Sequence, residues 1–211
     1  MDILNTLERT PVVPLVQAND AETAVHISRA LAKGGLTVAE VVFRTDAALE
    51  CLAAVAAEVP EMVAGAGTVL NAKQAAQAID AGAQFVVAPG LDEETVRYCQ
   101  SKSIPVYPGT MTPTEVTRAY NLGLRVVKFF PGSLAGGIPM LKALGSVFRE
   151  VRFMPTGGVS VSNLADFLAV PSVLACGGSW LTPADAIAAG NFDEITRLAA
   201  EAVAIARKVR G

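Results

Sequence analysis

The 211-residue sequence has few of the residues that metal and redox sites need. Its one histidine, His26, excludes a three-histidine zinc site and leaves only that residue for a Ser-His-Asp triad. We expect His26, which falls inside a helical stretch, to be a helix-surface or packing residue. The three cysteines, Cys51, Cys99 and Cys176, are odd in number and lack CxxC spacing. We expect them to be buried, free thiols of a reducing compartment.

Long apolar runs and an excess of basic charge are also missing. No apolar run approaches the ~18 residues of a membrane-spanning helix, and residues 1–5 lack the basic start and apolar run of a signal peptide. The formal net charge of −3 and the lack of basic-aromatic runs argue against nucleic-acid binding. We therefore expect a cytoplasmic enzyme that acts on a small molecule without a metal ion or cofactor, and that binds neither membrane nor nucleic acid.

Short β-rich apolar runs recur along the chain, and each is followed by an alanine-rich helical stretch. The eight runs cover residues 12–17, 38–43, 62–66, 84–88, 104–107, 125–130, 151–154 and 173–176. Capping and stop residues delimit helices between them, the clearest at residues 21–33, 71–81, 112–122 and 160–170. Eight β-then-α units with short connections predict a parallel sheet wrapped by helices.

Eight such units close naturally into a (β/α)8 TIM barrel, an α/β fold. We expect a single compact domain over residues 1–211, with a helix at residues 2–9 covering the bottom of the barrel. A helix at residues 191–210 would close the outer ring. An open doubly wound sheet is the alternative, although no GxGxxG follows the first strand. In a barrel the active site lies at the C-terminal ends of the strands, so the polar residues there are the candidates.

The sixth run carries a lysine, Lys128, inside the otherwise apolar sequence Val-Val-Lys-Phe-Phe-Pro. Strand alternation places Lys128 and Phe130 on one face, and both faces of a barrel strand are buried. Burial favours the neutral form of an amine, which is its nucleophilic form. The alternative is an edge-strand lysine whose amine extends to solvent.

The second run repeats this anomaly, because Glu40, Val42 and Arg44 share one face of the predicted strand. Arg44 lies nearer the C-terminal end, where its planar guanidinium could hold a carboxylate. Glu40 lies deeper and could exchange protons with a substrate held by Lys128. The alternative is an internal ion pair of Glu40 with Arg44 or with Lys128.

Glycine-containing segments close the remaining strands. Thr68 ends the third with its hydroxyl beside a small-residue run, although turn chemistry alone also explains such a segment. Glycine pairs follow the seventh and eighth strands, in residues 155–160 and 176–180. Their backbone N–H groups, with the helix N-termini that follow, predict a phosphate site.

These motifs together resemble one family, the 2-keto-3-deoxy-6-phosphogluconate (KDPG) aldolases, also called 4-hydroxy-2-oxoglutarate aldolases. They are Glu-x-x-x-Arg-Thr, Gly-Ala-Gly-Thr, Pro-Gly, Lys-Phe-Phe-Pro, Pro-Thr-Gly-Gly and Gly-Gly-Ser-Trp, on strands two, three, four, six, seven and eight. The resemblance runs from about residue 11 to the C-terminal helix. It implies a metal-independent, class I (Schiff-base) aldolase that cleaves KDPG to pyruvate and glyceraldehyde 3-phosphate in the Entner–Doudoroff pathway, as a homotrimer.

The same resemblance implies a role for each matching residue. Lys128 would form the Schiff base, and Glu40 would be the general acid and base. The substrate would be bound by Arg44 and Thr68 at the pyruvyl carboxylate, by Pro89 and Phe130 along the pocket, by Thr156 at the hydroxyls, and by Gly157, Gly158, Gly177, Gly178 and Ser179 at the phosphate.

The sequence departs from the family pattern at two places. Gly132-Ser133 follows Pro131 where members commonly have Ala-Glu, and Gln17 stands where some relatives carry arginine. The alternative functions are 2-keto-3-deoxy-6-phosphogalactonate aldolase, a phosphate-binding barrel lyase or synthase that forms no Schiff base, and a non-catalytic binder of phosphorylated ligands. Arg-Thr on strand two and the polar Thr156 favour the gluconate substrate over its galactonate epimer.

Overall fold

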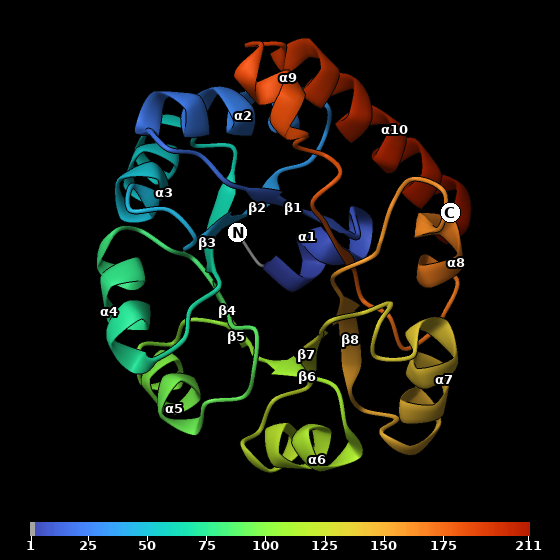
Figure 1. Cartoon of the computed structure of the whole chain (residues 1–211). Helices are drawn as coiled ribbons and strands as arrows, with labels where there is room; N and C mark the ends of the chain where they lie inside the picture. The colour runs from blue at the N-terminus through green and yellow to red at the C-terminus, as the bar shows by residue number, and fades with distance from the viewer. Residues whose placement is uncertain (1–2) are drawn as a thin grey trace.

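The computed structural model describes residues 3–211 as strands surrounded by a ring of helices (Figure 1). The strands are β1 Val12–Val16, β2 Val38–Val42, β3 Val63–Gly67, β4 Val86–Val87, β5 Val106–Tyr107, β6 Gly109–Thr110, β7 Val126–Phe129, β8 Arg152–Pro155 and β9 Cys176–Gly178. The helices are α1 Ile3–Arg9, α2 Ala21–Lys33, α3 Ala48–Glu58, α4 Ala72–Asp80, α5 Glu93–Ser101, α6 Pro113–Asn121, α7 Gly137–Val147, α8 Leu164–Leu168, α9 Ala184–Ala188 and α10 Phe192–Arg210.

All strand pairs are parallel, and the strands form two hydrogen-bonded sheets. The larger has the order β5-β4-β3-β2-β1-β9 and the smaller the order β6-β7-β8. Isolated parallel bridges, Phe153 to Val173 and Thr156 to Gly177, link the β8 side to the β9 side. The prediction of an α/β fold with a curled parallel sheet is confirmed.

Pro108 explains why nine strands are found in residues 3–211 where eight were predicted. A proline has no N–H to donate to a neighbouring strand, so the fifth run divides at this residue. The part before Pro108, β5, pairs with β4, whereas the part after it, β6, pairs with β7. The Pro108 carbonyl still accepts a hydrogen bond from the Lys128 N–H (3.0 Å).

Side-chain caps begin the principal helices much as the sequence predicts. Asp20, Asn71 and Asp92 each accept a backbone N–H three residues on, and Thr112 forms a full capping box with Glu115.

The helix predicted from residue 160 is shorter, because α8 begins only at Leu164. The Ser160 N–H donates to Asn163 Oδ1 (2.8 Å), and Asn163 Nδ2 donates to the Gly158 carbonyl (2.9 Å). These local hydrogen bonds compete with helix formation, so the segment before Leu164 stays a loop.

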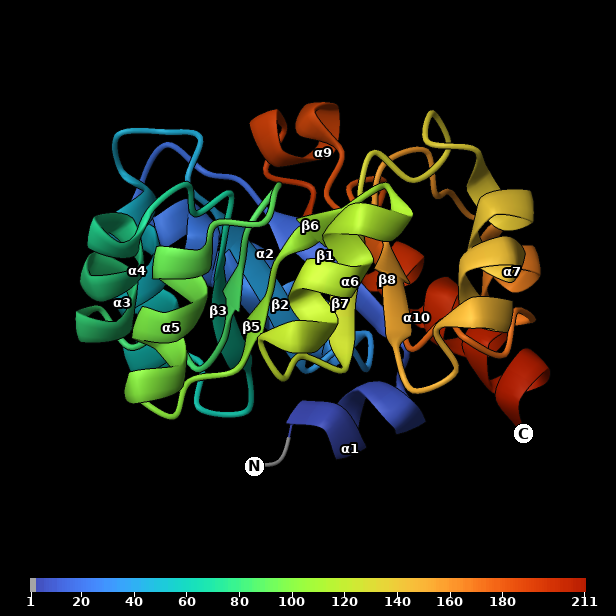
Figure 2. The ribbon, with the colours of Figure 1, turned by 90° about the horizontal axis from the view of Figure 1, so that it is seen from below.

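Two hydrophobic clusters lie on opposite sides of the strands. The outer cluster joins the strands to the surrounding helices, whereas the inner cluster fills the lower part of the space they enclose. Ile3 and Leu7 of α1 belong to the inner cluster, together with Val38 and Val63 at the starts of β2 and β3. Figure 2 shows α1 beneath the strands, where the sequence places the covering helix. Asp2, the predicted first residue of that helix, lies outside the described residues.

The exposure of the one histidine and the burial of the three cysteines follow the sequence prediction. His26 lies on the surface of α2, with a side chain 46% exposed, and stacks on Phe192 with ring centroids 5.1 Å apart. Cys51, Cys99 and Cys176 are buried and free. Within residues 3–211, no helix has the length and hydrophobicity to cross a membrane.

Burial should make the three thiols unreactive in the native protein. Desolvation raises the pKa of Cys99 to about 11, and it raises the pKa values of Cys51 and Cys176 as well. Since the thiolate is the reacting form, we expect negligible alkylation at pH 8 and complete alkylation in concentrated urea. Mass spectrometry after iodoacetamide treatment measures both, and rapid labelling of the native protein would contradict this prediction.

Candidate active site

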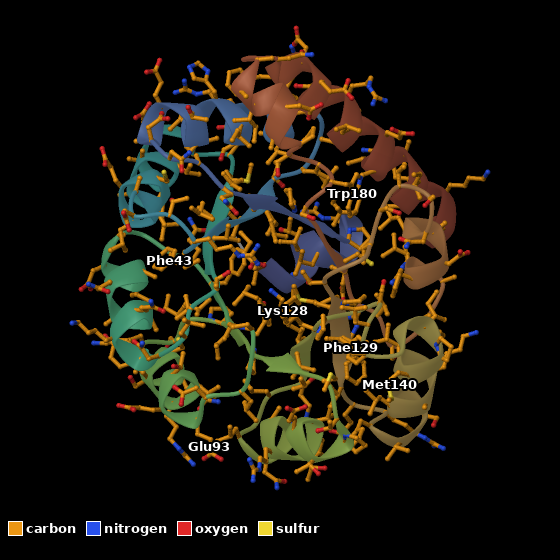
Figure 3. The ribbon with its side chains drawn as sticks, viewed as in Figure 1. Phe43, Glu93, Lys128, Phe129, Met140 and Trp180 are labelled. Carbon is orange, nitrogen blue, oxygen red and sulfur yellow. The ribbon has the colours of Figure 1, made fainter. Side chains whose placement is uncertain are left out.

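Lys128 of β7 and Glu40 of β2 meet inside the ring of strands. Their side chains are 4% and 2% exposed, and Lys128 Nζ lies 3.5 Å from Glu40 Oε1. Figure 3 shows Lys128 near the centre of the ring, far from the helical surface. The amine therefore does not extend to solvent as an edge-strand lysine would. The separation is longer than the 2.7–2.9 Å of a strong charged hydrogen bond, so the contact leaves the amine room to react.

Strand alternation brings this pair into the interior. Val127 and Phe129, on either side of Lys128, are fully buried in the outer cluster, so the lysine faces inward. The Phe130 ring lies beside the amine, with its centroid 5.3 Å from Nζ. A cation over an aromatic face is stabilised, and the ring also excludes water from one side of the amine.

Arg44 and Thr68 form a second group at the C-terminal ends of β2 and β3. Arg44 Nε donates to Thr68 Oγ1 (3.2 Å), and among residues 3–211 Arg44 has no acidic partner. Its remaining guanidinium N–H groups are therefore available to an anion. The Glu40–Arg44 ion pair that the sequence left open does not form, because Glu40 pairs with Lys128 instead.

Thr68 holds this position at a conformational cost. Its φ of 59° lies in the left-handed region, which a β-branched residue rarely adopts. Such backbone strain costs about 1–3 kcal/mol and concentrates at functional sites. No sequence pattern indicates this strain, because Thr68 follows a run of glycine and alanine that itself predicts a turn.

The two glycine pairs serve different purposes. Gly157 and Gly158 have positive φ values of 96° and 81°, which a glycine adopts without strain. Gly177 and Gly178 are strand residues, and the space where their Cβ atoms would lie is occupied by the side chains of Thr156 and Trp180. The second pair, which is buried, therefore makes room for neighbouring side chains.

The predicted support from helix N-termini is wrong in detail. The helices after these segments, α8 and α9, begin only at Leu164 and Ala184 and have five residues each. A strong macrodipole needs a longer helix that starts at the ligand. Backbone N–H groups and hydroxyls remain as the available donors for an anion.

A cavity of about 460 Å³ opens beside this second group. Arg44 and Ser179 line it, together with the apolar Leu15 and Ile187 and the acidic Asp20. Hydrogen bonds from the Thr23 N–H and hydroxyl hold the pKa of Asp20 below its usual value, so this rim stays negatively charged. The sequence identified Asp20 only as a helix cap, and no sequence signal places it at a cavity. Pro89 lines a separate, smaller cavity of about 250 Å³.

The Gly132-Ser133 departure lies directly against the first glycine pair. The Gly132 N–H donates to the Thr156 carbonyl (2.7 Å), and the Ser133 N–H donates to the Gly157 carbonyl (2.9 Å). The segment after β7 is thus bound through its backbone to the segment after β8.

Comparison with known proteins identifies the family to which the chain belongs. The model of the KDPG and KHG aldolase family, where KHG is 4-hydroxy-2-oxoglutarate, matches residues 3–198. The chain belongs to this family. A KHG/KDPG aldolase of Escherichia coli (strain K12) is 48% identical over 193 residues, which are 92% of this chain and 91% of that enzyme.

Two solved KDPG aldolases share both sequence and fold with this member of the family. That of Zymomonas mobilis ZM4, with 3-phosphoglycerate, is 42% identical with a TM-score of 0.90, and the match covers 99% of this chain and 98% of that chain. That of Legionella pneumophila is 36% identical with a TM-score of 0.91, and the match covers 95% and 97%. The Legionella structure holds pyruvate captured at low pH as a covalent carbinolamine intermediate.

The left-handed backbone of Thr68 predicts how substitutions at this position change the stability of the protein. Thr68→Gly relieves the left-handed strain, whereas Thr68→Val keeps the branched side chain and removes the hydroxyl that Arg44 contacts. We expect the glycine variant to have the higher free energy of unfolding of the two, by about 1 kcal/mol or more. Urea denaturation monitored by circular dichroism measures the difference, and a less stable glycine variant would show that Thr68 is unstrained.

Proposed function

We propose that this chain is a class I aldolase that cleaves KDPG to pyruvate and glyceraldehyde 3-phosphate, and that also acts on 4-hydroxy-2-oxoglutarate. The buried contact between Lys128 and Glu40 is the observation that carries the proposal. Family membership and the carbinolamine in the Legionella relative support it. A lyase or synthase that forms no Schiff base would keep its activity after treatment with borohydride and pyruvate.

The amine begins the reaction after it has lost a proton. Glu40 Oε1 is positioned to take that proton from Lys128 Nζ, and the neutral amine then attacks the substrate ketone. Glu40 returns the proton to the carbinolamine hydroxyl, which leaves as water and produces the iminium ion. The iminium ion is the electron sink for the next step.

Carbon–carbon cleavage follows from the same two groups. Removal of the proton from the C4 hydroxyl, by Glu40 directly or through water, releases glyceraldehyde 3-phosphate as the C3–C4 bond breaks. The electron pair of that bond moves into the iminium ion and forms an enamine. Protonation of the enamine at C3 and hydrolysis of the resulting iminium ion release pyruvate and regenerate Lys128.

We assign the binding residues by their match to the motifs of the family. Arg44 and Thr68 would hold the pyruvyl carboxylate, Phe130 and Pro89 would line the pocket, and Thr156 would face the substrate hydroxyls. The phosphate would lie on the backbone of Gly157 and Gly158, with Gly177, Gly178 and Ser179 opposite.

We further propose that residues 1–211 act as one domain, that the two sheets close into a (β/α)8 barrel, and that the protein is a cytoplasmic homotrimer. The bridges between the β8 and β9 sides and the unbroken chain between β5 and β6 support closure.

Leu134 and Val147, 90% and 72% exposed, are apolar side chains that subunit contacts in the proposed trimer would cover. Sedimentation equilibrium tests the trimer, and a monomer at micromolar concentration would contradict it.

Trapping the covalent intermediate tests the role of Lys128. Borohydride reduction in the presence of pyruvate should attach one pyruvyl group to Lys128, as peptide mass mapping would show. Lys128→Ala should lose both the adduct and essentially all turnover, whereas Lys142→Ala, an exposed lysine on α7, should keep both. An adduct on another lysine, or activity that survives borohydride, would refute the Schiff-base assignment.

A second variant separates proton transfer from binding. Glu40→Gln keeps the shape of the side chain but cannot accept a proton, so we expect kcat to fall about 10²–10⁴-fold. Glu50→Gln, an exposed position on α3, is the matched control and should retain normal kcat. A coupled dehydrogenase assay for pyruvate measures both variants, and a loss of less than about tenfold in Glu40→Gln would reject Glu40 as the general acid and base.

A further inference from the structure

Gly67, the last residue of β3, lies against the carboxylate side chain of Glu40. The adjacent strands β2 and β3 pair in parallel, with Val42 opposite Gly67 and Glu40 opposite Gly65. A Cβ atom built on Gly67 would overlap the Cγ, Cδ and Oε1 atoms of Glu40. The acid therefore occupies the space in which any other residue at position 67 would place its side chain.

Backbone conformation does not explain a glycine at this position. Gly67 is a strand residue and is absent from the positive-φ glycines of the described chain. An L-residue could adopt the same backbone angles, and glycine weakens a strand relative to residues with side chains. Because glycine has no Cβ atom, it alone leaves room for the Glu40 side chain on the inner face of β3.

The neighbouring Gly65 shows what the ordinary packing solution looks like. The ring of Phe85 fills the space on its inner face, so an apolar side chain of the inner cluster covers that glycine. At Gly67 the space is filled by the group to which we assign the proton transfers. The inner side of β3 therefore contacts the apolar core at Gly65 and the proposed reacting groups at Gly67.

Glu40 has little else to fix its orientation. Within residues 3–211 its only polar side-chain contact is with Lys128 Nζ, at 3.5 Å. A carboxylate with one long contact is not oriented by hydrogen bonding, so steric fit against the β3 backbone must do it. We propose that Gly67 is a positioning residue, whose missing side chain holds the Glu40 carboxylate within proton-transfer distance of Lys128.

This inference rests on the proposed function, and its consequence is a selective loss of proton transfer. A methyl group at position 67 pushes the carboxylate from its place but leaves Arg44, the glycine segment after β8 and the glycines of β9 untouched. General acid–base steps tolerate little displacement, because in the reacting complex the 3.5 Å contact must tighten to about 2.6–3.2 Å or be bridged by one water. Binding of the substrate should change much less than its turnover.

The test compares Gly67→Ala with Gly90→Ala, a glycine with open space around its Cβ position and no positive φ. We expect Gly67→Ala to lower kcat at least tenfold with KM within about threefold of the parent value. It should also slow exchange of the pyruvate methyl protons in D2O, a partial reaction that needs the imine and proton transfer but no aldehyde. Gly90→Ala should leave kcat, KM and exchange unchanged.

Variants that lack the acid show whether the effect passes through Glu40. In a Glu40→Ala background, Gly67→Ala should cause no further loss of turnover, because nothing remains for the methyl group to displace. If Gly67→Ala alone does not fold, Glu40→Ala/Gly67→Ala should be at least as stable as Glu40→Ala, since the methyl group then enters vacated space. A double variant less stable than Glu40→Ala, or one that loses as much again in kcat, would overturn the inference.

Failure of the proposed function would give a different result. If the parent protein forms no borohydride-trapped pyruvyl adduct, the Schiff-base mechanism itself is wrong. If the adduct forms on Lys128 but Gly67→Ala matches Gly90→Ala in kcat and proton exchange, only the positioning role of Gly67 is wrong.

Discussion

The enclosed contact between Lys128 and Glu40 is the constraint that the rest of the site must satisfy. Each group alone would be costly to remove from water, and deleting one partner of a buried ion pair typically costs about 3–5 kcal/mol. Their burial at 3% and 2% exposure is tolerable because the two groups share the same small space. The arrangement is nevertheless a loose one, at 3.5 Å, and a loose pair can exchange a proton and then separate. The stability of the buried pair and its ability to exchange a proton therefore depend on the same contact.

The residues around this pair are apolar on the side of α1 and polar at the C-terminal ends of the strands. Below it, the inner cluster and α1 form an apolar floor that admits no water, as the burial of Leu7, Phe85 and Val87 shows. Above it, the strand ends carry Arg44, Thr68 and the glycine segments, all of which present donors. Under the proposed function, the carboxylate and the phosphate of the substrate would both bind these donors, with the ketone directed downward to the amine.

Sequence patterns predicted the chemistry of the site better than its geometry. Lys128, Glu40 and Arg44 stood out because a charge in an apolar strand violates the expected pattern, and strand alternation correctly placed Lys128 and Glu40 on inner faces. Arg44 lies past the end of β2 and is exposed. The parallel α/β arrangement and most helix caps followed from local signals in the same way.

The features that the sequence could not supply depend on contacts between distant segments. The left-handed Thr68, the fit of Glu40 onto Gly67 and the fit of Thr156 onto Gly177 require knowledge of which strand lies beside which. A glycine pair has the same letters whether it exposes N–H groups to a ligand or admits a neighbouring side chain. Gly177 and Gly178 admit the side chains of Thr156 and Trp180. The contact of Gly177 with Thr156 can be recognised only once β9 is placed beside the end of β8.

The Gly132-Ser133 departure lies where the backbone holds the glycine segment after β8. Its two N–H groups donate to the carbonyls of Thr156 and Gly157, and these bonds need no particular side chain. A Cβ atom at position 132 would lie 3.1 Å from the Gly157 carbonyl oxygen, so a larger residue there fits only with a small shift of the segment after β8. The side chains that follow Pro131 also change the charge and the space beside Gly158, where Ser133 now lies. Substitution there can alter which distal group is accepted while the amine and the acid stay in place.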